Sequence, residues 1–127
     1  MRHRIVAPVA QPVKHTPDSI LDAARDLVLD GGPAAASTRA VSRASGAPSG
    51  SMYHRFASRG DLLAAVWLRA QDRFLAPYLD RLSAPGTGAG VAAAVTVLAW
   101  SHANRPDASI LLAYSLRDLG GDGLSPG

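Results

Sequence analysis

Apolar residues recur along most of the chain at intervals of three and four, the spacing that places side chains on one face of an α-helix. In the first such segment they are Ile20, Leu21, Ala24, Leu27 and Val28. Thr16-Pro17-Asp18 precedes it and supplies a cap, a first-turn proline and an acid at the positive end of the helix dipole. Gly31-Gly32-Pro33 follows and predicts its end.

Two short helices are predicted next. The first should begin at the capping residue Ser37 and run through Val41 to Ala44 before Gly46 breaks it. The next must lie between Pro48 and Phe56, because proline is tolerated only in a first turn. Two short helices joined by a glycine-containing turn and preceded by a longer helix form the helix-turn-helix pattern.

The remaining pattern is also helical, so the chain is expected to be all-α. A long fourth helix should run from about Ser58 to Leu82, with Pro77 kinking or ending it. A fifth is expected from Val91 to Ala103, and a sixth should begin near Asp107 and carry Ile110, Leu111, Tyr114 and Leu116. The glycine-rich stretch 86–90 follows a helix rather than a strand, so it is interpreted as a linker and not as a nucleotide loop.

The polar face of the first predicted helix carries a row of aspartates that recur every four residues: Asp18, Asp22, Asp26 and Asp30. Such a row could be a cation stripe. Carboxylates one turn apart are too widely spread to share one ion, so a solvated helix face is the preferred interpretation.

Composition narrows the class of protein. The chain has 127 residues, 47% of them hydrophobic, which is enough for one domain, or a small domain with part of another. It has no cysteine, so no disulfide framework or thiolate metal site is available. No apolar run is long enough to cross a bilayer, and the basic, proline-interrupted residues 1–15 lack the core of a signal peptide. We expect a cytoplasmic protein with a flexible basic arm at residues 1–15.

The charge is unevenly distributed. Residues 1–60 hold eight basic side chains against four aspartates, whereas the rest holds five arginines against six aspartates. This asymmetry favours a polyanion as the partner of the N-terminal half, although an arginine excess alone is more often a solubility feature.

The stretch Gly46 to Phe56 suggests how a polyanion would be bound. Ser49, Gly50 and Ser51 would let the start of a helix approach base edges in the major groove, and their hydroxyls can bond bases or phosphates. One turn later Tyr53, His54 and Arg55 are long enough to reach flanking phosphates. Each residue alone has a plainer interpretation, such as packing of Tyr53 on Phe56, but the combination at this spacing favours DNA contact.

From Ile20 to about Leu63 the chain resembles the DNA-binding domain of the TetR (tetracycline-repressor-like) transcriptional regulators. The resemblance rests on three segments, ILDAARDLV, STRAVSRASGAPSGSMYHRF and SRGDLLAAV. It implies a helix-turn-helix domain at residues 16–60, followed by a helical ligand-binding and dimerisation domain at residues 61–127. Family members normally continue with further helices, including a dimerising pair, so this second domain is expected to be truncated.

The resemblance also implies roles for particular residues. Thr38 and Arg39 match second-helix positions that contact DNA, and Ser49, Gly50 and Ser51 match the base-reading start of the recognition helix. Tyr53, His54 and Arg55 match its phosphate-facing segment, and Arg59 matches a basic position at the start of the fourth helix that contacts phosphate. The expected partners are therefore double-stranded operator DNA, an unknown small-molecule effector and a second copy of the chain in a homodimer.

The helical half carries aromatic and histidine side chains that would line an effector cavity if the family resemblance holds: Trp67, Phe74, Trp100, His102 and Tyr114. Aromatic residues in helices are more often part of the core, so the alternative is that these side chains pack in the core and contact no ligand. No catalytic motif is present, and no enzyme activity, cofactor or metal is expected. The hypothesis is a ligand-responsive repressor that binds a palindromic operator; the alternative is a truncated helical protein-interaction module without productive specific DNA binding.

Overall fold

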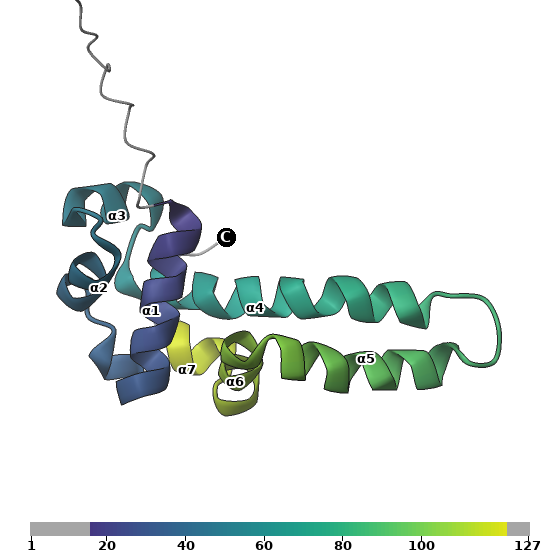
Figure 1. The fold of residues 1–127 in the computed structure, drawn as a ribbon. Coiled ribbons are helices and arrows are strands. Elements are labelled where there is room, and N and C mark those ends of the chain that lie inside the picture. Colours follow the sequence, from purple (N-terminus) through teal and green to yellow (C-terminus); the bar gives the residue numbers. More distant parts are fainter. Residues whose placement is uncertain (1–15, 122–127) are drawn as a thin grey trace, which may run out of the picture.

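A computed structural model describes residues 16–121, and every regular element in that range is a helix. The expected arm at residues 1–15 lies outside the described residues. The elements in chain order are α1 (Pro17–Gly31), the 3-10 helix η1 (Pro33–Ala35), α2 (Thr38–Ser45), α3 (Ser49–Arg55), α4 (Arg59–Leu82), α5 (Ala89–Ala103), α6 (Arg105–Ala113) and α7 (Leu116–Gly120). The all-α prediction is confirmed. Figure 1 shows α1, α2 and α3 gathered at one end of the molecule, with α4 and α5 extending from it as an antiparallel pair.

Local signals determine the ends of α1. The Thr16 hydroxyl oxygen accepts a hydrogen bond from the Ser19 backbone N–H at 3.2 Å. At the other end Gly32 adopts φ 82°, a conformation that glycine reaches without a side-chain penalty. The expected start and end of this helix are confirmed.

A single apolar core joins the elements. It contains Ile20, Val28 and Leu63, all fully buried, and it extends to Ile110 of α6 and Leu119 of α7. The last two helices therefore pack against the helix-turn-helix end rather than forming a core of their own. This shared core runs across residue 60, where the sequence placed a domain boundary.

The antiparallel pair of α4 and α5, which we call the arm, differs in burial along its length. The buried residues of α4 all lie in its first half, up to Ala70, and Ala93 is the only buried residue of α5. The predicted end of the fourth helix at Leu82 is confirmed, and of the two alternatives for Pro77 the one in which it ends the helix is excluded. A proline inside a helix removes a single backbone hydrogen bond, so a long helix such as α4 can continue past it. The stretch interpreted as a linker does connect α4 to α5, although α5 already begins at Ala89.

The last helical segment differs from its prediction. Instead of one helix running to Leu116, α6 ends at Ala113, Tyr114 is extended (φ −134°, ψ 146°), and α7 begins at Leu116. The reason is a capping box that starts a new helix: the Ser115 hydroxyl accepts from the Asp118 N–H, and the Asp118 carboxylate accepts from the Ser115 N–H at 2.7 Å. The Ser-x-x-Asp spacing was visible in the sequence and would have revealed this break.

None of the described helices is long and apolar enough to cross a membrane.

Candidate nucleic-acid interface

The turn between α2 and α3 is held by bonds within a few residues. Gly46 adopts the left-handed conformation (φ 76°), and its N–H donates to the Ser42 carbonyl at 2.9 Å. The Ser42 hydroxyl in turn donates to the Ala47 carbonyl at 2.5 Å. Beneath the turn Val41, Ala47 and Met52 are buried. These contacts fix the angle between the two short helices, as a helix-turn-helix requires.

With Met52 buried, the opposite face of α3 points to solvent. At 100° per residue Gly50 and His54 lie nearly opposite Met52, with Tyr53 and Ser51 on either side of them. Gly50, Tyr53 and His54 are exposed, and Ser51 is partly exposed. Ser49 is also exposed, at the first position of the helix, and no side chain caps α3. The structure therefore brings the expected base-reading and phosphate-facing residues onto one accessible helix.

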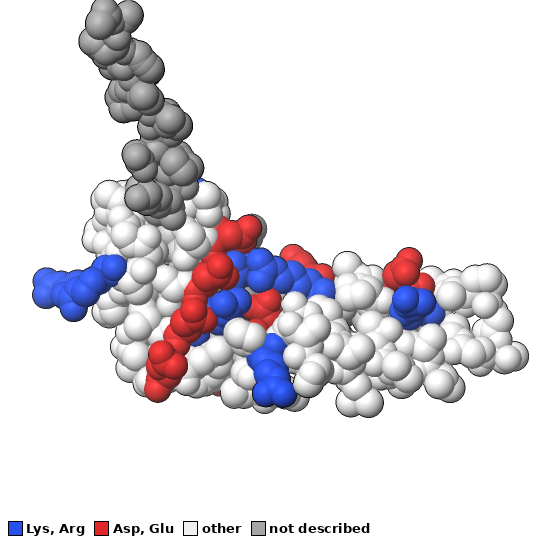
Figure 2. Space-filling model, viewed as in Figure 1, with Lys and Arg blue, Asp and Glu red and all other residues white. Residues whose placement is uncertain are grey.

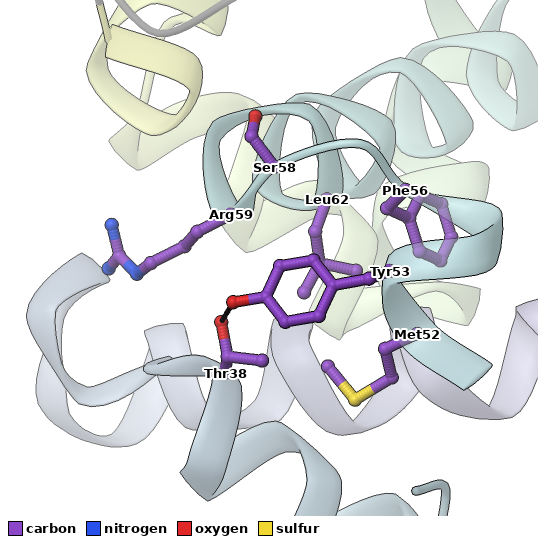
Figure 3. Close-up of a pocket in the computed structure, with 7 residues that line it drawn as sticks. All are labelled: Thr38, Met52, Tyr53, Phe56, Ser58, Arg59 and Leu62. Carbon is purple, nitrogen blue, oxygen red and sulfur yellow. Dashed lines mark hydrogen bonds between the residues drawn. The ribbon is translucent and has the colours of Figure 1, made fainter. Parts of the chain in front are cut away.

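The start of α2 meets α3 through one polar contact. The Tyr53 hydroxyl donates to the Thr38 hydroxyl at 3.4 Å, a long bond (Figure 3). The gap beside this contact between α2 and α3, which we call the seam, is about 10 Å³. It is lined by Thr38, Met52, Tyr53, Phe56, Ser58, Arg59 and Leu62. A space of that size has no room for an organic ligand. The seam is packed, so Thr38 and Tyr53 are presented together at the surface.

Arg59 has a different environment from the other predicted DNA-contacting residues. It is only partly exposed, and its Nε donates to the Ala36 carbonyl at 3.0 Å. One of its terminal nitrogens donates to the Pro33 carbonyl. Arg59 therefore ties the start of α4 to the segment before α2.

The charge around the two short helices is of one sign. No acidic residue occurs between Asp30 and Asp61, and Arg39, His54 and Arg55 are exposed there. Arg43 is exposed as well, and the prediction missed it. It follows Arg39 by four residues, so both side chains lie on the same face of α2, and that spacing was a readable signal.

The five residues predicted to line an effector cavity do not come together in one place. Phe74 and Trp100 meet edge to face with ring centroids 5.4 Å apart. Both line an apolar groove of about 180 Å³ between α4, α5 and α6. Trp67 lies elsewhere, donating its Nε1–H to the Tyr114 carbonyl at 2.9 Å, and both of these residues pack against the main core. His102 is exposed and does not border the groove.

A short exposed helix, in a stretch of sequence without acidic residues and held at a fixed angle by a buried turn, is typical of a helix-turn-helix DNA-binding domain. Residues 20–66 match the family model of the bacterial regulatory proteins of the tetR family. The chain therefore carries a DNA-binding domain of the TetR type over these residues, which supports a DNA-binding transcriptional regulator. No curated protein and no solved structure matches the chain significantly.

Proposed function

We propose that the chain is a transcriptional repressor that binds a palindromic operator as a homodimer and releases it when a small molecule binds. In this proposal α3 enters the major groove, with Ser49, Gly50 and Ser51 nearest the bases. Thr38 and Arg39 of α2 and Tyr53, His54 and Arg55 of α3 contact the backbone.

The exposed face of α3 carries the proposal. Tyr53 keeps 54% of its surface accessible although it is a large aromatic residue next to a core, where burial would be favourable. Its hydroxyl lies against Thr38, so two groups able to bond phosphate lie side by side on different helices. An exposed, positioned aromatic hydroxyl among basic side chains suits a surface that docks on a polyanion.

The test begins with selection of bound duplexes from a randomised pool, which supplies the operator. Arg39→Ala should then weaken binding to operator and random duplex alike, and lower the slope of log affinity against log salt by about one. Arg81→Ala is the matched control, because Arg81 is also exposed but lies near the far end of α4. Equal effects of the two variants, or no enriched sequence, would contradict the proposal.

Base reading is tested separately. Ser51→Asn should redistribute preference among operator variants and leave affinity for random duplex nearly unchanged, because amide groups pair differently with base edges than hydroxyls do. An unchanged preference in a repeated selection would mean that Ser51 contacts phosphate only.

For Arg59 the contacts favour a supporting role over direct phosphate binding. Its donors to Ala36 and Pro33 hold the segment before α2, on which Thr38 and Arg39 depend. Arg59→Ala should therefore lower the free energy of unfolding, by about 1–3 kcal/mol for two lost charge-assisted bonds. A lowered salt slope with unchanged stability would instead assign Arg59 to phosphate.

For the effector, the groove of Phe74 and Trp100 is the supported location. Its volume of about 180 Å³ is below the roughly 300–1,000 Å³ of sites for drug-sized ligands, so the proposal is a small apolar molecule. A thermal-shift screen of small aromatic and aliphatic compounds on wild type and Phe74→Ala tests this. Hits should stabilise the wild type and lose that effect in the variant.

A second candidate function, a protein-interaction module, is favoured by one observation. On α5, Val91, Val95 and Leu98 are 69%, 57% and 74% exposed, and Leu112 of α6 is 86% exposed. Surfaces of this kind often mark contacts with other proteins. Sedimentation with and without operator separates the candidates, because the repressor forms a two-chain complex on a palindrome and the interaction module binds no sequence selectively.

A further inference from the structure

Asp107, in the first turn of α6, is the one buried charged residue among those described, with 4% of its surface exposed. One carboxylate oxygen accepts from Arg25 Nη1 of α1 at 3.1 Å, and the other accepts from Arg73 Nη1 of α4 at 2.9 Å. The same carboxylate therefore binds the helix-turn-helix end, α1–α3, which we call the reading head, through α1, and it binds the arm through α4. We call these three residues, Arg25, Arg73 and Asp107, the clamp.

The clamp continues into a wider network between α1 and α4. Arg69 binds Asp22 at 2.7 Å and Asp18 at 3.2 Å, and Arg25 also binds Asp26 at 3.0 Å. Figure 2 shows the acidic row of α1 lying against basic side chains where α1 crosses α4. Asp18, Asp26 and Asp30 are exposed, as expected for a solvated face, and Asp22 is half-buried. Three of the four carboxylates also pair with arginines. Within the described ion pairs, α6 joins this network through Asp107.

The charge state of the clamp follows from its contacts. Burial would raise the pKa of Asp107, but the hydrogen bonds from Arg73 and Arg25 outweigh it and hold that pKa below its ordinary value. Asp107 is therefore an anion at neutral pH. A buried carboxylate with two guanidinium partners resists displacement, because removing it would leave charges uncompensated.

The apolar groove lies directly beside the clamp. Phe74 follows Arg73 on α4 and Ala108 follows Asp107 on α6, and both Phe74 and Ala108 line the groove. The groove and the clamp therefore occupy the same turns of α4 and α6.

We propose that Asp107 is a positioning residue for operator binding, because its two ion pairs fix the orientation of α1–α3 relative to α4–α6. This rests on the proposed function. Two reading heads on a palindrome must keep a fixed separation, near one helical turn of DNA. Losing the clamp should therefore relax the preference for half-site spacing, while each head still recognises its own half-site.

The experiment uses the full chain and duplexes selected by the wild type: the palindrome, the same palindrome with two base pairs inserted at its centre, and a single half-site. Asp107→Asn keeps the shape of the side chain and removes its charge. Asp26→Asn is the matched control, because Asp26 also accepts from Arg25 but is exposed and joins no second helix. Asp107→Glu tests rescue by a restored charge.

The wild type should discriminate against the inserted duplex by about tenfold, within the usual range of coupling between sites. Asp107→Asn should reduce this ratio to about twofold and change half-site affinity less than twofold. Asp26→Asn should keep the wild-type ratio, and Asp107→Glu should recover part of it. Circular dichroism establishes folding, and if Asp107→Asn does not fold, Arg73→Gln replaces it, because Arg73 is 41% exposed in its side chain and its loss leaves Asp107 paired with Arg25.

Equal ratios for Asp107→Asn and Asp26→Asn would overturn the positioning role. So would an equal loss on palindrome and half-site, which is the result expected of a purely structural residue. Failure of the proposed function is measured separately, with the wild type alone. If no operator is selected, or if the palindrome has no advantage over the half-site, the repressor hypothesis is wrong and the positioning role is wrong with it.

Discussion

The two ends of the molecule bury their apolar residues to different extents. At the helix-turn-helix end, Ile20, Val28, Val41 and Leu63 are completely buried. On the arm, α5 carries no Lys, Arg, Asp or Glu, yet it buries only Ala93. A helix that is apolar on all sides is normally surrounded by protein.

This difference in burial shows where the hydrophobic pattern identifies the buried face of a helix and where it does not. At the head each helix has a polar outer face and an apolar inner one, so the pattern indicates which side faces the core and which faces solvent. On α5 no side is marked, and contacts alone decide what is covered. Figure 2 shows an arm with few charged side chains on the visible face, against a head and crossing region that carry most of them.

The largest expected effect is at the head. Leu62→Ala removes a core side chain with 2% of its surface exposed and should lower the free energy of unfolding by about 2–5 kcal/mol. Chemical denaturation followed by circular dichroism measures it. A loss below 1 kcal/mol would show that the head is loosely packed and would remove its contrast with the arm.

A smaller effect is expected at the junction between head and arm. Asp107→Asn should lower the free energy of unfolding by about 1–3 kcal/mol at pH 7. The folded-state pKa of Asp107 is lowered, so this stabilisation is present above the unfolded pKa and is lost as pH falls through the folded value. The difference between wild type and variant should therefore shrink below about pH 4. A constant difference from pH 7 to pH 3 would contradict the assignment of charge to Asp107.

The next smaller effect on stability is expected at Gly46, in the turn between α2 and α3. Gly46→Ala should cost about 1–2 kcal/mol of stability, because φ is 76° there and a side chain disfavours the left-handed region. Nothing lies within 4 Å of an added Cβ at Gly46 or at Gly50, so crowding does not contribute at either position. Gly50→Ala, where φ is not positive, is the control and should leave stability unchanged or raise it by up to about 1 kcal/mol. Similar losses in both variants would mean that the turn is not the constraint.

The smallest effect belongs to the arm. Leu98→Ala should change the free energy of unfolding of the isolated chain by less than about 0.5 kcal/mol, because 74% of that side chain is already exposed. A loss that approaches the loss from Leu62→Ala, and that depends on protein concentration, would show that α5 is covered by a second copy.

Much of the head could be predicted from the sequence because its signals are local. Thr16 and Ser37 each cap a helix three residues before the amide they bind, and Gly46 ends α2 through a bond to Ser42. The exposed residues of α3 follow from Met52 alone, since one buried position sets the face of a seven-residue helix. Arg59 did not follow, because its carbonyl partners lie 23 and 26 residues away.

By itself the sequence determined the helices, the turn and the sign of the charge at the reading head, since caps, periodicity and glycine conformations act within one or two turns of the chain. Tertiary structure alone decided that Asp107 meets Arg25 across 82 residues, that Leu119 joins the core of the head, and that Phe74 and Trp100 share a groove which Trp67 and His102 do not line. The physical reason is that burial and ion pairing depend on which surfaces meet, and residues distant in sequence are brought together only when the helices pack.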